Sequence, residues 1–222
     1  MIITSNGFLI HSRKYKETSS IIYVFTPLKG MQSLLFKGKY TNKEKFKFSL
    51  FNEYQFSYDE KYTFPFLSKF EIIKIYSFDR KYYLLGLYIN ELLYKTLKQG
   101  YDFEKIYDYY KSFLINLSSS SGSCIALALL FEKNLLDNLG YGLNIDSDHT
   151  IEDSINYSYD FDYGFKVSEK YQKKCSINGK NLRDFFSNKM IDENETIYLR
   201  NIIKQILSKI YPNIILNGDK LF

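Results

Sequence analysis

The sequence predicts an α+β protein in which a small, closed, five-stranded barrel comes first and a helical domain follows. Short segments rich in β-branched and aromatic residues fill residues 6–77, and an apolar repeat of about 3.6 residues replaces them after Asp79. Strands followed by helices are typical of α+β proteins or of two separate domains. We therefore expect a boundary near residues 78–80, with a barrel domain over 1–79 and an all-helical domain over 80–222.

The barrel is predicted from five short strands within the first 80 residues. Pro27 to Gly30 forms a turn signal, so the segments on either side of it are expected to pair as a hairpin. Closing five strands into a barrel leaves no exposed sheet edge. The expected strands cover residues 7–14, 19–26, 31–37, 51–58 and 67–76.

The helices are predicted from apolar residues that recur at helical spacing. Gly100 and Gly140 follow two of the expected helices as stop signals, and Pro212 ends the last one. An acidic, polar and tyrosine-rich stretch predicts an irregular excursion at about 143–178. The expected helices cover residues 80–98, 103–117, 125–139, 179–187 and 193–210.

The composition indicates a globular protein of the cytoplasm. Hydrophobic residues make up 45% of the 222, enough for a core, and no stretch of 18 apolar residues is present. Met1 to Ser5 lacks the basic start and apolar run of a signal peptide. Cys124 and Cys175 are the two cysteines and have no CxxC spacing, so we expect free thiols, no zinc module and no cofactor.

The positive charge is concentrated in the first third of the chain. Residues 1–80 contain 13 Lys or Arg and 7 Asp or Glu, whereas residues 81–222 contain 17 and 18. This asymmetry predicts a polyanionic partner for the N-terminal part. Because 26 of the 30 basic residues are Lys, an AT-rich coding bias also explains lysine richness by itself, and the positions of the residues matter more.

A basic segment between the third and fourth strands is the main candidate for binding nucleic acid. Its lysines would neutralise phosphates and its aromatic rings would stack on unpaired bases. The alternative is a solvated lysine loop whose aromatic residues pack into the barrel. Three basic residues near the first turn would widen the same surface, or are ordinary surface charges. The candidates are Lys37, Lys39, Tyr40, Lys43, Lys45 and Lys47, with Arg13, Lys14 and Lys16 near the turn.

Several segments, in order along the chain, resemble the RecO family of bacterial recombination mediators. They are Gly7 to Arg13 followed by Glu17-Thr18-Ser19, then Val24-Phe25-Thr26 with Gly30 and Phe36-Lys37-Gly38, then Leu87 to Leu93, and finally Phe131 to Leu143. The resemblance implies an N-terminal OB-fold followed by a helical domain. It also implies binding to single- and double-stranded DNA, annealing of complementary strands, and help in loading RecA onto strands coated by single-strand binding protein (SSB). The implied partners are RecR, the acidic C-terminal tail of SSB and, indirectly, RecF and RecA.

The sequence departs from the family in places that bear on these implications. Many members carry a four-cysteine zinc module after the Gly-Tyr-Gly segment, and here Cys175 stands alone in that region. Leu129 and Leu130 occupy positions that are often basic in relatives, which weakens the implied SSB-tail contact. The candidate groove for such a tail is Phe131, Lys133, Leu135 and Leu136, with packing inside the helical bundle as the alternative.

No catalytic motif is apparent, so we expect a protein that is not an enzyme. His11 has no neighbouring pattern that would make it a base, and Gly140-Tyr141-Gly142 lacks the spacing of a phosphate loop. Asn90 and Glu91 interrupt an apolar helical stripe, and we interpret them as hydrogen-bonding residues that tie the helix to a loop. Two alternatives stay open: an RNA-binding OB-fold protein, and a metal-dependent enzyme using the acidic residues between 146 and 162.

Overall fold

The computed structural model describes residues 2–37, 48–59, 61, 64–119, 122–145, 150–168 and 175–218. The chain forms two compact units. Unit 1 comprises Met1–Ser121 and Leu216–Phe222, and unit 2 comprises Gly122–Ile215. Unit 1 is therefore built from two separated stretches of sequence, because the chain returns to it after unit 2.

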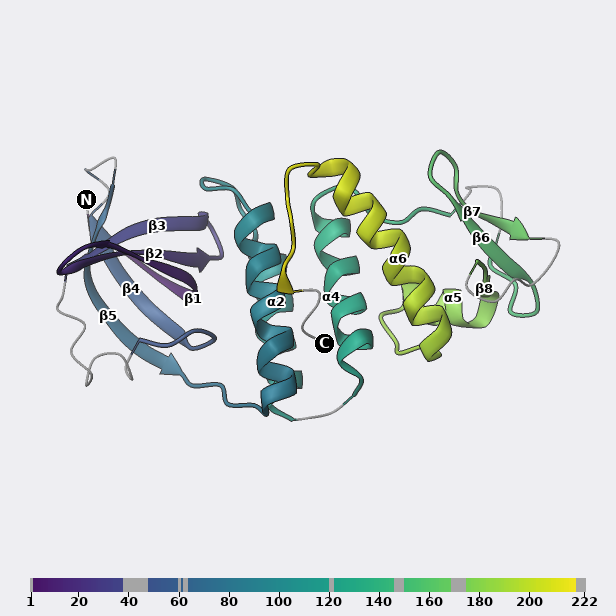
Figure 1. Cartoon of the computed structure of the whole chain (residues 1–222), viewed down its shortest axis with the longest axis horizontal. Helices are drawn as coiled ribbons and strands as arrows, with labels where there is room; N and C mark the ends of the chain where they lie inside the picture. Colours follow the sequence, from purple (N-terminus) through teal and green to yellow (C-terminus); the bar gives the residue numbers. More distant parts are fainter. Residues whose placement is uncertain are drawn as a thin grey trace. The chain divides into compact units, whose positions relative to one another are not determined.

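The first strands of unit 1 close into a five-stranded barrel (Figure 1). They pair in the order β1-β2-β3-β5-β4, and every pair is antiparallel except β3 with β5. This mixed five-stranded arrangement is the OB-fold, and it confirms the predicted α+β fold class. The strands are β1 (Ile2–Lys16), β2 (Ser19–Thr26), β3 (Gly30–Lys37), β4 (Glu53–Asp59) and β5 (Phe66–Lys74).

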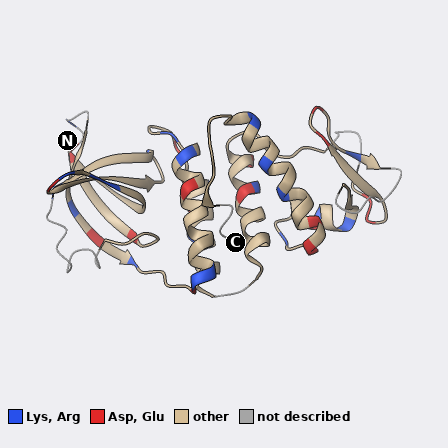
Figure 2. Ribbon diagram, in the orientation of Figure 1, with Lys and Arg blue, Asp and Glu red and all other residues tan. Residues whose placement is uncertain are grey.

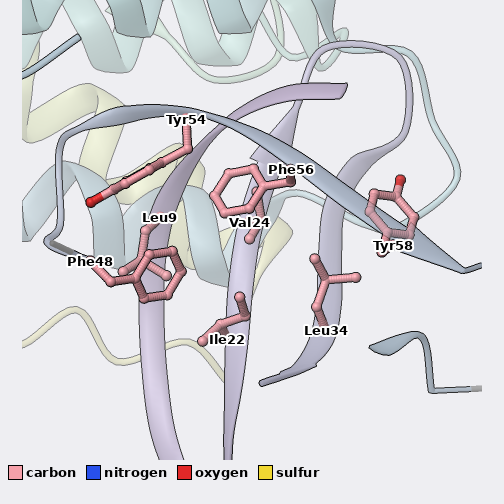
Figure 3. Close-up of a cluster of buried hydrophobic side chains, with 8 residues drawn as sticks. All are labelled: Leu9, Ile22, Val24, Leu34, Phe48, Tyr54, Phe56 and Tyr58. Carbon is pink, nitrogen blue, oxygen red and sulfur yellow. The ribbon is translucent and has the colours of Figure 1, made fainter. Parts of the chain in front are cut away.

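Alternate side chains of the strands fill the inside of the barrel. Figure 3 shows this core converging from four strands and from the segment that precedes β4. A β-bulge between Leu9 and His11 shifts the register of β1 against β2. Such a bulge re-aims the side chains that follow it. The core residues are Leu9, Ile22, Val24, Leu34, Phe48, Tyr54, Phe56 and Tyr58.

Two helices of unit 1, α2 (Arg80–Thr96) and α3 (Glu104–Ser118), cover the outside of the barrel. The Phe8 side chain of β1 packs against α3. Its ring centroid lies 5.0 Å from that of Tyr107 and 4.9 Å from that of Tyr110. Asn90 of α2 donates a hydrogen bond to the Ile10 carbonyl at 3.2 Å. Ring packing therefore fixes α3 to β1, and the Asn90 hydrogen bond fixes α2 to the same strand.

Unit 2 combines three helices with a small sheet. The buried guanidinium of Arg200 in α6 donates to the carboxylate of Glu132 in α4 at 3.1 Å, which joins the two helices. The antiparallel sheet has the order β7-β6-β8. The elements are α4 (Cys124–Asn138), β6 (Asn156–Asp160), β7 (Gly164–Ser168), β8 (Ile177–Asn178), α5 (Gly179–Phe186) and α6 (Glu193–Ile210).

This sheet differs from the all-helical domain and the irregular excursion expected from the sequence. The sheet lies within 143–178, the stretch interpreted as irregular because it is acidic and polar. Tyr157 and Phe165 point from β6 and β7 into the interior of unit 2, where each is 1% exposed. A hairpin with one buried aromatic residue per strand shows only a weak alternating pattern in its sequence. The acidic and polar composition therefore led to the expectation of irregular structure.

Candidate nucleic-acid interface

Five of the nine predicted DNA-contact residues lie outside the described part of the chain. These are Lys39, Tyr40, Lys43, Lys45 and Lys47. The structure places the other four, and all of them are exposed. Arg13, Lys14 and Lys16 lie at the end of β1, and Lys37 is the last residue of β3.

Strand pairing brings these four residues to one end of the barrel. Ser19, the first residue of β2, is paired with Lys16 on one side and with Lys37 on the other. Lys14 is paired with Ser20, and Arg13 with Ile21. Because neighbouring strands lie about 4.8 Å apart, four cations separated by up to 24 residues in sequence form one patch. We call Arg13, Lys14, Lys16 and Lys37 the basic end.

The basic end keeps its charge available. Among the residues that the structure describes, no carboxylate forms an ion pair with any of its four members, whereas Lys69 on β5 pairs with Glu71 at 2.5 Å. The Lys37 ammonium lies 4.4 Å from the centre of the Phe66 ring, a cation–π contact that orders the side chain without neutralising it. Figure 2 shows the basic and acidic positions of the described residues by colour.

The aromatic residues next to the basic segment divide between two roles. Phe48 is 5% exposed, and its ring stacks against that of Phe36 with 5.8 Å between centroids. Both rings pack with the barrel core, as the alternative interpretation of the segment expected for them. Base stacking by this segment would therefore depend on other rings, such as Tyr40.

The groove predicted on α4 consists of buried side chains. Phe131, Lys133, Leu135 and Leu136 are all 5% exposed or less. The Lys133 ammonium donates to Asp137 Oδ2 and to Asn188 Oδ1, both at 3.1 Å. These contacts favour the alternative interpretation, packing within unit 2, although binding of a partner at this helix stays a prediction.

A cluster of three rings beside the basic end was not predicted. His11 of β1 lies 5.1 Å from Tyr94 of α2 and 5.6 Å from Tyr23 of β2, and the two tyrosine rings are 4.7 Å apart. Partial burial of the His11 ring lowers its pKa, and the nearby Arg13 guanidinium lowers it further. No local pattern in the sequence indicates this cluster, because His11 and Tyr94 are separated by more than 80 residues.

The acidic residues of the predicted metal alternative do not converge where the structure describes them. Asp146 and Asp148 lie outside the described residues. Asp153 pairs with Arg183 at 3.0 Å and Asp160 pairs with Lys166 at 2.6 Å. Within the described ranges, no three His, Cys, Asp or Glu side chains are grouped to hold a metal ion.

Comparison with known proteins decides the family. The model of the C-terminal part of recombination protein O matches residues 77–215, and the model of its N-terminal part matches residues 1–76. The chain belongs to the RecO family. The resemblance inferred from the sequence is thereby confirmed, as is the matching description as a DNA repair and recombination protein with an N-terminal barrel.

Curated relatives match this RecO-family chain over nearly its whole length. The DNA repair protein RecO of Psychromonas ingrahamii is 27% identical over 215 residues, which cover 91% of each chain. The RecO of Coxiella burnetii (strain CbuG_Q212) is 28% identical over 92% of this chain and 90% of its own. That of Escherichia coli O9:H4 is 28% identical over 80% and 76%. Among the described residues, no helix has the length and apolar character needed to cross a membrane.

Proposed function

We propose that this chain is a cytoplasmic, non-enzymatic mediator of DNA recombination that binds single- and double-stranded DNA and anneals complementary strands. It would help to load RecA onto SSB-coated single strands. Family membership over nearly the whole chain supports this role. The observation that carries it is the basic end of the OB-fold, where four exposed cations meet without a carboxylate partner among the described residues.

The mechanism that we propose is charge neutralisation. Two complementary strands repel each other through their phosphates, and bound ammonium and guanidinium groups lower that repulsion, so that bases can pair. Binding by this means is independent of sequence, because phosphates carry no sequence information. No bond is made or broken by the protein, so no nucleophile, metal or cofactor is required.

The partners that we propose follow from family membership. RecR, the SSB tail and, indirectly, RecF and RecA would be met mainly by residues 80–222, with DNA bound mainly by residues 1–79. Because Phe131 and Leu135 are buried, we expect a tail contact at this helix to involve exposed side chains beside them.

Reversal of charge tests the proposed DNA contact. We expect Lys14→Glu/Lys16→Glu/Lys37→Glu to abolish annealing and to flatten the salt dependence of single-strand binding. Each lost phosphate contact should lower the slope of log K against log salt by about 0.7. A second variant, Lys39→Glu/Lys43→Glu/Lys45→Glu, tests the residues that the structure does not describe. Annealing of fluorescent complementary strands and binding in a salt series are the measurements.

A matched control separates position from net charge. Lys98→Glu/Lys105→Glu/Lys180→Glu changes three exposed lysines that are not part of the basic end by the same charge, and should retain annealing. Equal loss in both variants would mean that overall charge, and not the basic end, carries binding. Competition between DNA and RNA oligonucleotides of one sequence tests the RNA alternative, which tighter binding of the RNA would favour.

A further inference from the structure

A cleft of about 450 Å³ opens in unit 1 between β1, α2 and the returning C-terminal segment. This volume is within the range of sites for small molecules. Ile10 and His11 of β1, Leu87 and Tyr94 of α2, and Asn217 of the C-terminal segment are among the residues that line it. The cleft adjoins the basic end, because Arg13 lies two residues beyond His11 on the same strand.

The walls of the cleft offer aromatic ring faces. The rings of His11 and Tyr94 are tilted by 42°, with 5.1 Å between centroids, and Tyr23 supports Tyr94 edge-on at 4.7 Å. His11 is exposed, whereas Tyr23 and Tyr94 are partly buried. A flat ring entering the cleft can therefore stack on a platform that is already ordered by its neighbours.

The charged groups that line the cleft, Glu91 and Lys95, are already bonded. Glu91 accepts hydrogen bonds from Lys95 at 2.6 Å, from the Gly218 amide at 2.7 Å and from the Asn217 amide at 3.2 Å. Asn90 donates to the Ile10 carbonyl. Because these groups are satisfied within unit 1, the cleft presents rings and apolar surface instead of an unpaired charge. Such a surface suits a ring bound by stacking without recognition of its edges.

The charge around the cleft identifies the chemistry attached to that ring. Burial and the Tyr23 hydroxyl raise the pKa of Tyr94, whereas the Arg13 guanidinium lowers it. Two residues of a strand span about 7 Å. Arg13 is thus set beside the cleft, with Lys14 and Lys16 continuing the positive charge along β1. An anion linked to a stacked ring would find its counter-charge there.

We propose that this cleft binds one unpaired base of single-stranded DNA, stacked on His11 and Tyr94, while Arg13 contacts the adjoining phosphate. The proposal deepens the proposed function and rests on it, since it assigns a site that discriminates single strands from duplex. Bases paired in a duplex keep their faces covered by their neighbours and cannot enter. Stacking accepts any base, which agrees with the sequence-independent binding proposed above.

The test uses the full-length chain and an oligothymidylate carrying one 2-aminopurine, whose fluorescence falls on stacking. We expect the wild type to quench it. His11→Ala should abolish most of the quenching and weaken single-strand affinity about tenfold relative to duplex affinity. The matched variant His11→Phe keeps a ring and should restore both. Thermal unfolding followed by circular dichroism verifies that each variant is folded.

The outcomes separate this inference from the proposed function. If the wild type binds DNA but His11→Ala leaves single-strand affinity and quenching unchanged, the base site is disproved and the proposed function stands. If the wild type binds no DNA, the proposed function itself fails. A third outcome also overturns the base site. In it, an acidic peptide ending in Phe binds the wild type but not His11→Ala, while both proteins bind DNA equally well.

Discussion

Asn90 and Glu91 show how single polar residues organise unit 1. Asn90 Nδ2 donates to the Ile10 carbonyl, and the Tyr110 hydroxyl donates to Asn90 Oδ1 at 2.5 Å, so one amide joins β1, α2 and α3. Glu91, one residue later, accepts from two backbone amides of the C-terminal segment. The expected tie from the helix to a loop is observed for Glu91, whereas Asn90 joins the helix to a strand and to another helix. Buried polar groups with complete hydrogen bonding specify one packing arrangement.

Tyr76 is a contrasting residue, because its buried hydroxyl has no hydrogen-bond partner among the described residues. Burial and the Glu53 carboxylate raise its pKa to about 12. The folded state therefore holds a proton that the unfolded state releases near pH 10. The stability contributed by the neutral hydroxyl is complete below pH 10 and is lost as the pH rises towards 12.

We expect Tyr76→Phe to preserve or slightly raise stability at pH 7, by up to about 1 kcal/mol, because no hydrogen bond is lost. It should also lessen the fall in stability between pH 10 and 12. Urea unfolding at pH 7, 9 and 11 measures both effects. Tyr101→Phe, at an exposed position, is the control. A loss of more than 1 kcal/mol at pH 7 would show that the Tyr76 hydroxyl has a stabilising partner.

Helix α2 contains a glycine whose role depends on a neighbouring element. Gly86 lies in the interior of the helix, where Ala is ordinarily better by about 1 kcal/mol. A Cβ at this position would meet the Phe51 ring at 2.8 Å. Phe51 is 2% exposed and has a φ of 70°, a left-handed conformation that a bulky residue seldom adopts, so it cannot easily move away.

We therefore expect Gly86→Ala to destabilise the protein, by about 1–3 kcal/mol from overpacking, in spite of the better helix propensity of Ala. Chemical unfolding measures the change. The double variant Gly86→Ala/Phe51→Leu should lose less stability than the sum of the two single variants, because the smaller side chain relieves the clash. Additive losses would exclude direct contact as the cause.

At the level of elements, periodicity predicted what local sequence can encode. The helices and four of the five strands appear close to their expected bounds: residues 80–98 were expected for α2, and it spans Arg80–Thr96. The first strand is longer than the expected 7–14, because β1 begins at Ile2. The β1 bulge was not predicted, because it depends on pairing with β2. Lys16 and Lys37 come together because β2 pairs with both β1 and β3, and His11 meets Tyr94 because α2 packs on β1. The candidate site was therefore predictable in its residue types but not in its geometry.

At the scale of the whole molecule, the boundary between the compact units lies at a different residue from the change in apolar period. The apolar period changes after Asp79, and the family models meet between residues 76 and 77. The contacts of α2 and α3 with the barrel nevertheless place both helices in unit 1, which ends at Ser121 before the chain returns at Leu216. A sequence pattern reports where local structure changes, whereas a compact unit is set by which buried surfaces meet.

The returning C-terminal segment gives a prediction for the whole chain. Burial by itself raises the pKa of Glu91, but hydrogen bonds from Lys95 and from the amides of Gly218 and Asn217 lower it below its ordinary value of 4.5. Deletion of residues 216–222 removes two of these donors. We expect it to destabilise unit 1 by about 1–3 kcal/mol at pH 7, although the deleted residues lie next to unit 2 in sequence.

The pH dependence distinguishes this mechanism from a general loss of packing. Because the folded pKa of Glu91 is lowered, its hydrogen bonds contribute fully above pH 4.5, and that contribution is lost as the pH falls through the folded value. The cost of the deletion should therefore shrink between pH 5 and 3, as measured by urea unfolding of both chains. Asn217→Ala keeps both backbone amides and is the matched control, which should behave as the wild type. If the cost of the deletion is the same at both pH values, the segment stabilises unit 1 by packing alone, and Glu91 is not its anchor.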